Sequence, residues 1–246
     1  MEFESPVPMK ITFPLGDDQI HVVVHQRGAP WPTMVNIHDD ENTSVEAGLA
    51  NINRLGGRLI ELVHSGERLV TFHADGERFS FDPNRIFSDT GIEDTLTKES
   101  HYSKPAHAAI KSFAASYLGQ FALDREPAII ALHNTVDGIF SVESFVPSGY
   151  LGSNAALVHV SAKRSKFDFF YVTEQTFYNY LVKRDFNVVL QDNTNVTDDG
   201  SMSVHFSRKS IPYINIEAKM GHLQNQIEMV NAAREMLGEL QPVKNP

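Results

Sequence analysis

The sequence of 246 residues contains no cysteine. This absence excludes a disulfide framework, a thiolate metal site and a cysteine nucleophile. Basic residues are scarce as well, because 21 Lys and Arg stand against 31 Asp and Glu, which gives a formal net charge of −10. An acidic chain is poorly suited to bind a polyanion, so we do not expect nucleic acid as a partner.

Long hydrophobic runs are also absent. Nowhere do 18 consecutive apolar residues occur, so we expect no membrane span and no membrane partner. Residues 1–8 have neither the basic nor the apolar region of a signal peptide. We therefore expect a soluble, cytoplasmic protein, or a periplasmic or secreted one if a signal peptide was trimmed. The sequence does not specify an oligomeric state.

The overall composition is typical of a globular protein. Hydrophobic residues make up 41% of the sequence, with 15 Gly and 12 Pro, so the chain is neither disordered nor collagen-like. One domain over residues 1–246 is expected from this length. Strand-like and helix-like stretches alternate for most of it, which indicates a layered α/β fold with a mixed or largely parallel sheet.

The expected elements follow from hydrophobic periodicity and turn residues. Strands are predicted at 10–13, 20–24, 33–38, 58–63, 128–133, 140–145, 157–160, 167–172, 187–190 and 213–216, and helices at 42–55, 104–121, 174–183 and 220–240. The strands within residues 1–30 are expected at the edge of the sheet. The apolar run at 128–133 is typical of a central strand. Residues 64–102 are rich in Gly, Asp, Ser and Thr, and we expect a long functional loop there.

Three predicted strands end in polar side chains, which are His38, His133 and Glu217. Ligands of open α/β sheets collect beyond the carboxyl ends of the strands, so we expect these residues to converge. The H-x-x-E spacing of His38 and Glu41 can place an imidazole and a carboxylate on one ion. With His133 this makes the His₂Glu set of a catalytic zinc site, and Glu217 beside it can act as general base.

Each of these residues also has an ordinary structural interpretation. A histidine at the end of a strand is more often a hydrogen-bonding residue than a metal ligand. Asp39, Asp40 and Glu41 could form the acidic N-terminus of a helix, because negative charge is favourable there. If Glu41 only caps the helix, Glu46 is the substitute ligand one turn later.

A second motif, Asp82-Pro83-Asn84-Arg85-Ile86-Phe87, lies within the 64–102 segment. A guanidinium beside an amide is a good clamp for a carboxylate, so Asn84 and Arg85 are candidate substrate-binding residues. Arg78 could supply a second positive group. The alternatives are that Asn84 and Arg85 close a turn, and that Arg78 pairs with an exposed acid. A carboxylate held near a zinc-activated water suggests hydrolysis of an amide close to a free acid.

Taken in their order along the chain, the H-x-x-E motif, the Asp82–Phe87 motif, His133 and Glu217 resemble the zinc carboxypeptidase superfamily. The Asp82–Phe87 motif and the Leu-His-Asn-Thr tetrad at 132–135 resemble most closely its aspartoacylase and succinylglutamate desuccinylase branch. The resemblance implies a three-layer α/β/α sandwich and one Zn²⁺ per chain. The roles that it implies are zinc ligation by His38, Glu41 and His133, carboxylate binding by Asn84 and Arg85, and general base/acid catalysis by Glu217.

The sequence also departs from this branch. Asp39 and Asp40 stand where Gly and Asn are usual, and Pro83 stands where Leu is usual. We predict a zinc hydrolase that acts on a small molecule or peptide bearing a carboxylate, either as a carboxypeptidase or as an N-acyl-amino-acid deacylase. A zinc cell-wall amidase is an alternative, which would not need Asn84 and Arg85. A non-catalytic binding module of the same fold is another.

Overall fold

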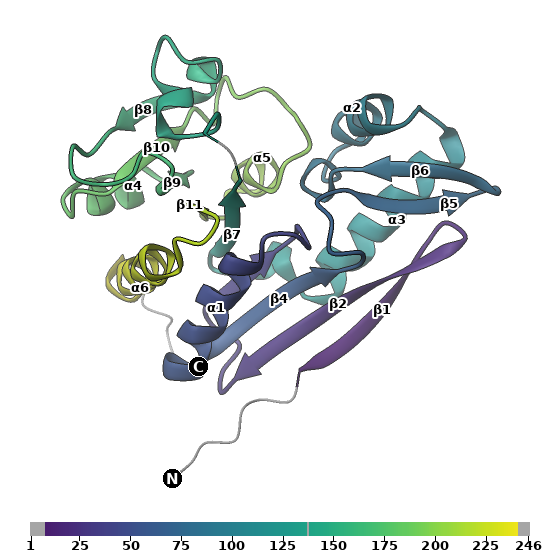
Figure 1. Ribbon diagram of the computed structural model, residues 1–246, viewed down its shortest axis with the longest axis horizontal. Coiled ribbons are helices and arrows are strands. Elements are labelled where there is room, and N and C mark those ends of the chain that lie inside the picture. Colours follow the sequence, from purple (N-terminus) through teal and green to yellow (C-terminus); the bar gives the residue numbers. More distant parts are fainter. Residues whose placement is uncertain (1–7, 137, 241–246) are drawn as a thin grey trace.

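A nine-stranded sheet is the middle layer of the computed structural model, which describes residues 8–136 and 138–240 (Figure 1). Its strand order is β1-β2-β4-β3-β7-β11-β9-β10-β8. The strands are β1 (Met9–Leu15), β2 (Asp18–Arg27), β3 (Thr33–Asn36), β4 (Gly57–Val63), β7 (Ile129–Thr135), β8 (Ala155–His159), β9 (Phe169–Val172), β10 (Asn187–Gln191) and β11 (Tyr213–Lys219). The two ends of the expected domain, residues 1–7 and 241–246, lie outside the described residues.

Helices cover both faces of this sheet. The helices α1 (Asn42–Leu55), α4 (Gln175–Val182) and α6 (Leu223–Leu240) pack in one hydrophobic cluster, and α2 (Asp89–Glu99), α3 (Lys104–Gln120) and α5 (Met202–Arg208) pack in another. Figure 1 shows α1 and α6 on one side of the sheet and α3 on the other. The three-layer α/β/α sandwich predicted from the sequence is confirmed.

The central strand β7 explains why the two clusters are separate. All seven of its residues are buried, and their side chains alternate between the faces. Ile129 and Ala131 belong to the cluster of α2, α3 and α5, whereas Ile130 and Leu132 belong to that of α1, α4 and α6. Such a strand is apolar in sequence because both of its faces are covered.

Strand direction decides where polar strand ends meet. The pairs β4/β3, β3/β7, β7/β11 and β9/β10 are parallel, and the remaining four pairs are antiparallel. The sheet is therefore mixed, with its parallel part in the middle and with β1 at an edge, as expected. Because β3, β7 and β11 are parallel neighbours, their carboxyl ends lie at the same edge of the sheet.

The expectation of one long loop over residues 64–102 is wrong. This segment contains a hairpin of β5 (Val70–Ala74) and β6 (Glu77–Phe81), a 3₁₀ turn at Pro83–Arg85, and α2. Gly66, Asp75 and Gly76 lie in its bends and turns, and Gly76 has a φ of 78°, whereas Asp89, Gly91 and Asp94 belong to α2. The residues of β5 alternate between buried and exposed, so the hairpin buries one apolar face against the sheet.

Two other short segments also differ from the prediction. Residues 140–145 do not form a strand, because Val142–Phe145 is a 3₁₀ helix whose first turn is capped by Ser141 and Ser144. The helix α5 was not predicted, since its buried Met202, Val204 and Phe206 alternate with polar residues as they would in a strand. Within the described part of the chain, no helix has both the length and the hydrophobicity that a membrane span requires.

We predict that Ile130→Ala destabilises the protein strongly, because Ile130 is fully buried in the central strand. The free energy of unfolding, measured by urea denaturation, should fall by about 2–5 kcal/mol. Leu157→Ala on the edge strand β8 is the matched control. Leu157 is 43% exposed, so its truncation should cost less than about 1 kcal/mol. Equal losses from the two variants would contradict the sheet order described above.

Candidate metal centre and cavity

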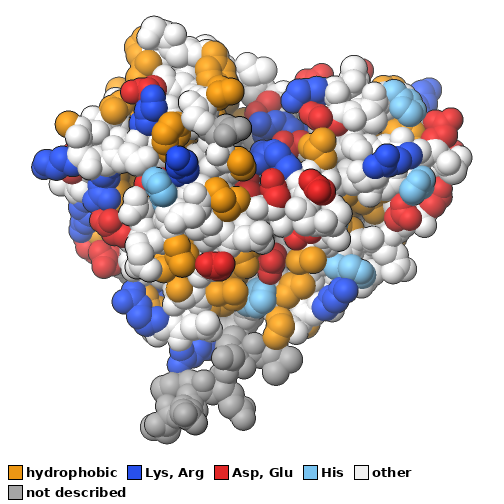
Figure 2. Space-filling view, in the orientation of Figure 1, with side chains coloured by type: hydrophobic (Ala, Val, Ile, Leu, Met, Phe, Trp, Pro, Cys, Tyr) orange, Lys and Arg blue, Asp and Glu red, His pale blue; other side chains and the backbone are white. Residues whose placement is uncertain are grey.

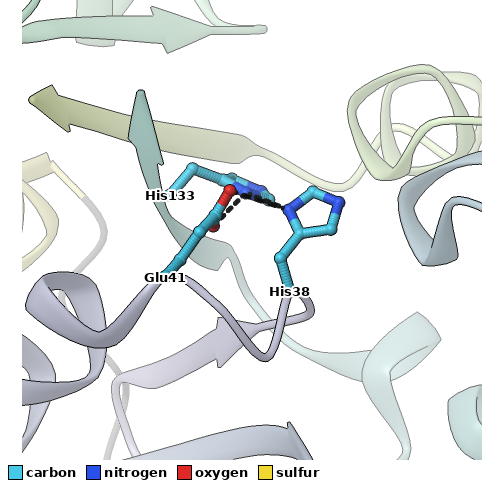
Figure 3. Close-up of side chains that lie close together, drawn as sticks. All are labelled: His38, Glu41 and His133. Atoms are coloured by element: carbon cyan, nitrogen blue, oxygen red, sulfur yellow. Dashed lines mark hydrogen bonds and ion pairs between the residues drawn. The ribbon is translucent and has the colours of Figure 1, made fainter. Parts of the chain in front are cut away.

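Three buried side chains point toward one another at the carboxyl edge of the parallel strands (Figure 3). His38 lies two residues beyond β3, Glu41 directly precedes α1, and His133 belongs to β7. Each side chain is at most 3% exposed. The sequence could indicate each residue separately, and the pairing of β3 with β7 brings them together.

The two histidines turn the same ring nitrogen toward Glu41. His38 Nδ1 is 2.9 Å from Glu41 Oε1, and His133 Nδ1 is 2.9 Å from Glu41 Oε2. The two Nδ1 atoms are 3.2 Å apart. One nitrogen from each ring and one carboxylate oxygen thus lie within 4.8 Å of one another. Two imidazoles and a carboxylate are the donor set that a catalytic zinc ion uses, so the residues present fit a metal ion.

The side chain of Glu41 does not cap the helix that it precedes. Glu41 is the N-cap residue of α1, yet its side chain makes no capping hydrogen bond. Its carboxylate is instead engaged by both histidines and by Arg68, whose Nη1 lies 2.9 Å from Oε1. Glu46, the substitute ligand, is exposed. The geometry therefore favours Glu41 in the ligand set.

Asp82 completes the environment of His38 from the opposite side of the ring. His38 Nε2 is 2.9 Å from Asp82 Oδ1. Burial alone would lower the pKa of His38, but the charges and hydrogen bonds of Glu41 and Asp82 outweigh it and raise this pKa to about 9. Although burial opposes it, His38 also holds the pKa of Glu41 and Asp82 well below the usual carboxylate range. A carboxylate on the outer nitrogen fixes which nitrogen of a ligating histidine faces the metal.

A network of buried amides holds the backbone of the site. Asn134 Oδ1 accepts the backbone N–H of Ser44 in the first turn of α1, and Asn134 Nδ2 donates to Gln226 of α6. Gln226 in turn donates to the backbone carbonyl of His133, at 2.9 Å. These bonds tie α1, β7 and α6 together around His38, Glu41 and His133. They explain the asparagine of the Leu-His-Asn-Thr tetrad by its structural role.

Glu217 lies beside His133 because the two residues are direct partners in the parallel pair of β11 and β7. The Glu217 side chain is buried, and Asn215 Nδ2 donates to its Oε1 at 3.1 Å. Burial raises the pKa of Glu217, the charge of His133 lowers it and that of Glu41 raises it further, with a net upward shift. A carboxyl group with a raised pKa next to a metal site suits proton transfer.

One cavity of about 470 Å³ is lined by these residues together with others from distant parts of the chain. His38, Glu41, His133 and Glu217 line it, and so do Asn84 and Arg85. In the space-filling view, basic and acidic side chains lie side by side in the hollow between the β8–β10 region and the β5–β6 hairpin (Figure 2).

Arg78 does not line this cavity. It is an exposed residue of β6, opposite His73 in the hairpin. The second guanidinium at the cavity comes instead from Arg68, which contacts Glu41 and lies 3.5 Å from Asp82. The residues around Arg68 in the sequence do not indicate that it reaches the cavity, because its place in space depends on the hairpin that follows. Asp39 also has a structural contact, since its carboxylate accepts the backbone N–H groups of His64 and Gly66.

Neither a protein-family model nor a curated protein matches this chain. Several solved structures resemble it, among them the following three. Thrombin activatable fibrinolysis inhibitor (TAFI) is 10% identical, with 94% of this chain and 69% of that chain covered and a TM-score of 0.53. A candidate metallopeptidase from Shewanella amazonensis SB2B is 14% identical, with 95% and 87% covered and a TM-score of 0.45. An aspartoacylase family protein from Mesorhizobium loti MAFF303099 is 14% identical, with 100% and 71% covered and a TM-score of 0.44.

The likeness to TAFI extends over nearly the whole chain and concerns the fold. It confirms the layered α/β architecture that the sequence implied. At 10% identity the likeness concerns the fold alone. The chemistry must therefore be inferred from the residues that converge at the carboxyl edge of the sheet.

We predict that Asp82→Asn weakens metal binding while the fold is retained. Asparagine can still accept the backbone N–H of Asn84, as Asp82 does at 2.8 Å, but it removes the charge that orients His38. The affinity for zinc, measured by competition with a chromophoric chelator, should fall about 10- to 100-fold. Asp94→Asn, an exposed acid of α2, is the control with the same change of charge. Unchanged affinity in Asp82→Asn would remove Asp82 from the site.

We also predict that zinc affinity increases with pH. The raised pKa of His38, about 9, means that a metal ion must displace a proton from this residue at neutral pH. Between pH 7.5 and 8.5 the affinity should therefore rise by up to about tenfold. Calorimetric titration of the metal-free protein in two buffers of different ionisation enthalpy would count the protons released. No proton release at pH 7.5 would contradict this prediction.

Proposed function

We propose that this protein is a zinc-dependent hydrolase that cleaves an amide bond close to a free carboxylate of its substrate. The observation that carries the proposal is the convergence of three groups in one cavity, which are a His₂Glu donor set, a buried carboxyl with a raised pKa, and the Asn84–Arg85 pair. Each group alone has an ordinary structural explanation. Their presence around one cavity is what favours catalysis.

The donor set would hold the zinc through His38 Nδ1, His133 Nδ1 and an oxygen of Glu41. Zinc with two histidines and one carboxylate supplies Lewis acidity and lowers the pKa of a coordinated water toward about 7. Asp82 orients His38 through its outer nitrogen. The corresponding nitrogen of His133 is buried and has no hydrogen-bond partner among the described residues, so Asp82 is the one carboxylate that orients a ligand histidine.

Glu217 is the group we propose to move the proton. It lies next to His133 on the neighbouring strand, so it is close to the donor set without belonging to it. As a general base it takes the proton of the attacking water, and as a general acid it gives this proton to the leaving nitrogen. Its burial raises its pKa, which suits a group that must hold this proton before it passes it on.

The two arginines of the cavity have different proposed roles. Arg68 is held by Glu41 and Asp82 beside the donor set, where it can stabilise negative charge that develops on the scissile carbonyl. Arg85 is 37% exposed, and together with Asn84 it can bind the substrate carboxylate. The Asn84 amide oxygen accepts the Met202 N–H, so the amide nitrogen is the group available to a carboxylate.

The presence of Asn84 and Arg85 in the cavity favours a carboxylate-bearing substrate over the cell-wall amidase alternative. An amidase would use the donor set and Glu217 but would have no need of a carboxylate clamp. The binding-module alternative requires a defective catalytic set. It is disfavoured because both histidines and both glutamates are present and are oriented toward the cavity.

The first experiment is elemental analysis of the purified protein after chelation and reconstitution with zinc. We expect about one zinc per chain, and its loss in His38→Ala or His133→Ala. The absence of stoichiometric metal in the wild-type protein would refute the hydrolase and favour the binding module.

We predict that Glu217→Gln retains the metal but lowers kcat for carboxylate-bearing amides about 10²- to 10⁴-fold, because it removes the base and keeps the shape. Metal content and turnover are measured on the same preparation. Glu46→Gln, an exposed acid of α1, is the matched control and should leave both unchanged. Loss of metal in Glu217→Gln would show that Glu217 is a ligand instead.

A further inference from the structure

A second charged residue faces the cavity beside the proposed carboxylate clamp. Asp199 lines the cavity, and its Oδ2 is 3.6 Å from Arg85 Nη1. Both side chains are partly exposed, at 44% and 37%. A clamp that bound only a carboxylate would be weakened by this arrangement, because Asp199 neutralises Arg85 and repels the incoming negative charge.

The backbone around this ion pair is fixed by contacts on both sides. Phe87 N–H donates to the Gly200 carbonyl at 3.0 Å, and Met202 N–H donates to Asn84 Oδ1 at 3.1 Å. A side chain on Gly200 would come within 2.5 Å of the Arg85 carbonyl oxygen, so the two segments approach too closely for any residue but glycine. Asp199 itself is oriented by the Ser201 N–H, which donates to its Oδ1 at 3.0 Å.

Such a pair of opposite charges is complementary to a zwitterion. In a free α-amino acid head group the ammonium nitrogen and the carboxylate carbon are about 2.5 Å apart, given ordinary bond lengths and angles. The carboxylate can bind Arg85 while the ammonium binds Asp199, and the four charges then alternate in sign. A partly exposed ion pair contributes little by itself, so a substrate can insert between its members.

We propose that the substrate carries a free α-amino acid head group, which Arg85 and Asp199 bind, and that the scissile amide is on the side chain of this amino acid. This inference rests on the proposed function and specifies its substrate class, namely N-ω-acylated diamino acids. It distinguishes them from peptide C-termini and N-α-acyl-amino acids, in which the nitrogen next to the carboxylate carbon is an uncharged amide and leaves Asp199 without a partner.

The acyl group of this substrate is apolar. Hydrophobic side chains line the same cavity, and they include Val136, Ile139, Phe140, Phe145 and Leu151. Ile139 and Val136 are 78% and 58% exposed, which is unfavourable in water and is relieved when an apolar group covers them. An aromatic or aliphatic acyl chain fits this wall better than a charged one.

The reaction is a simple hydrolysis. Water adds to the amide carbonyl, the bond between the carbonyl carbon and the side-chain nitrogen breaks, and the proton released by water goes to the leaving nitrogen through Glu217. The products are a carboxylic acid and a free diamino acid. No oxidant, reductant or further reactant is required.

The test compares three benzoyl amides with the zinc-loaded protein. Nε-benzoyl-lysine has the complete head group, 6-benzamidohexanoate lacks its ammonium, and N-benzoyl-1,5-diaminopentane lacks its carboxylate. The ornithine and 2,4-diaminobutyrate homologues vary the length of the side chain. We expect kcat/KM for the best zwitterionic compound to exceed that of its analogue without the ammonium by at least tenfold. Binding of the same compounds to the metal-free protein, measured by calorimetry, should show the same preference.

Asp199→Asn identifies the residue responsible. This variant should bring the two carboxylate compounds to within about threefold of each other, and Asp192→Asn should retain the wild-type preference. Asp192 is an acid of the same segment that does not line the cavity. Equal binding and turnover of the two compounds by the wild-type protein would overturn the inference, as would a preference that persists in Asp199→Asn.

The outcomes also separate this inference from the proposed function. If the protein hydrolyses carboxylate amides without preferring the ammonium, the hydrolase stands and the zwitterion site is refuted. If it binds the zwitterion selectively through Asp199 but hydrolyses none of the amides, the head-group site stands and the hydrolase is refuted.

Discussion

The buried carboxylate of Glu41 between two imidazoles is the interaction on which the rest of the site depends. A buried carboxylate is costly unless positive charge and hydrogen bonds compensate for it. His38, His133 and Arg68 provide that compensation, each within 2.9 Å of a carboxylate oxygen. The same arrangement places two imidazole nitrogens and a carboxylate oxygen within 4.8 Å of one another, as the binding of one metal ion requires. The cluster that stabilises the metal-free protein is therefore also suited to bind zinc.

This cluster can form because the middle of the sheet is parallel. Because β3, β7 and β11 are parallel neighbours, their carboxyl ends meet at one edge of the sheet. The register between β7 and β11 makes Glu217 the direct partner of His133. The apolar clusters on both faces hold these strands rigidly. A rigid sheet edge gives the side chains a fixed geometry, whereas the Arg85–Asp199 pair is supplied by two connecting segments that are joined by hydrogen bonds.

The sequence predicted secondary structure correctly where a local pattern of residues marks the element. Helix α1 was predicted with its observed bounds because an acidic turn precedes it and two glycines follow it. The apolar run of β7 indicated a central strand in the same way. The hairpin within residues 64–102 was missed, because its turn residues resemble those of a loop and its apolar residues alternate only over five positions.

By itself, the sequence determined the alternation of strands and helices, and it indicated His38, Glu41, His133 and Glu217 as candidate site residues. These features are local, since each depends on residues within a few positions of one another. Only the tertiary structure decided that Arg68 and not Arg78 faces the cavity, and that Asp199 lies beside Arg85. Arg68 contacts residues 14 and 27 positions away, and Arg85 contacts a residue 114 positions away. These contacts depend on how separate segments pack, and no pattern of neighbouring residues specifies them.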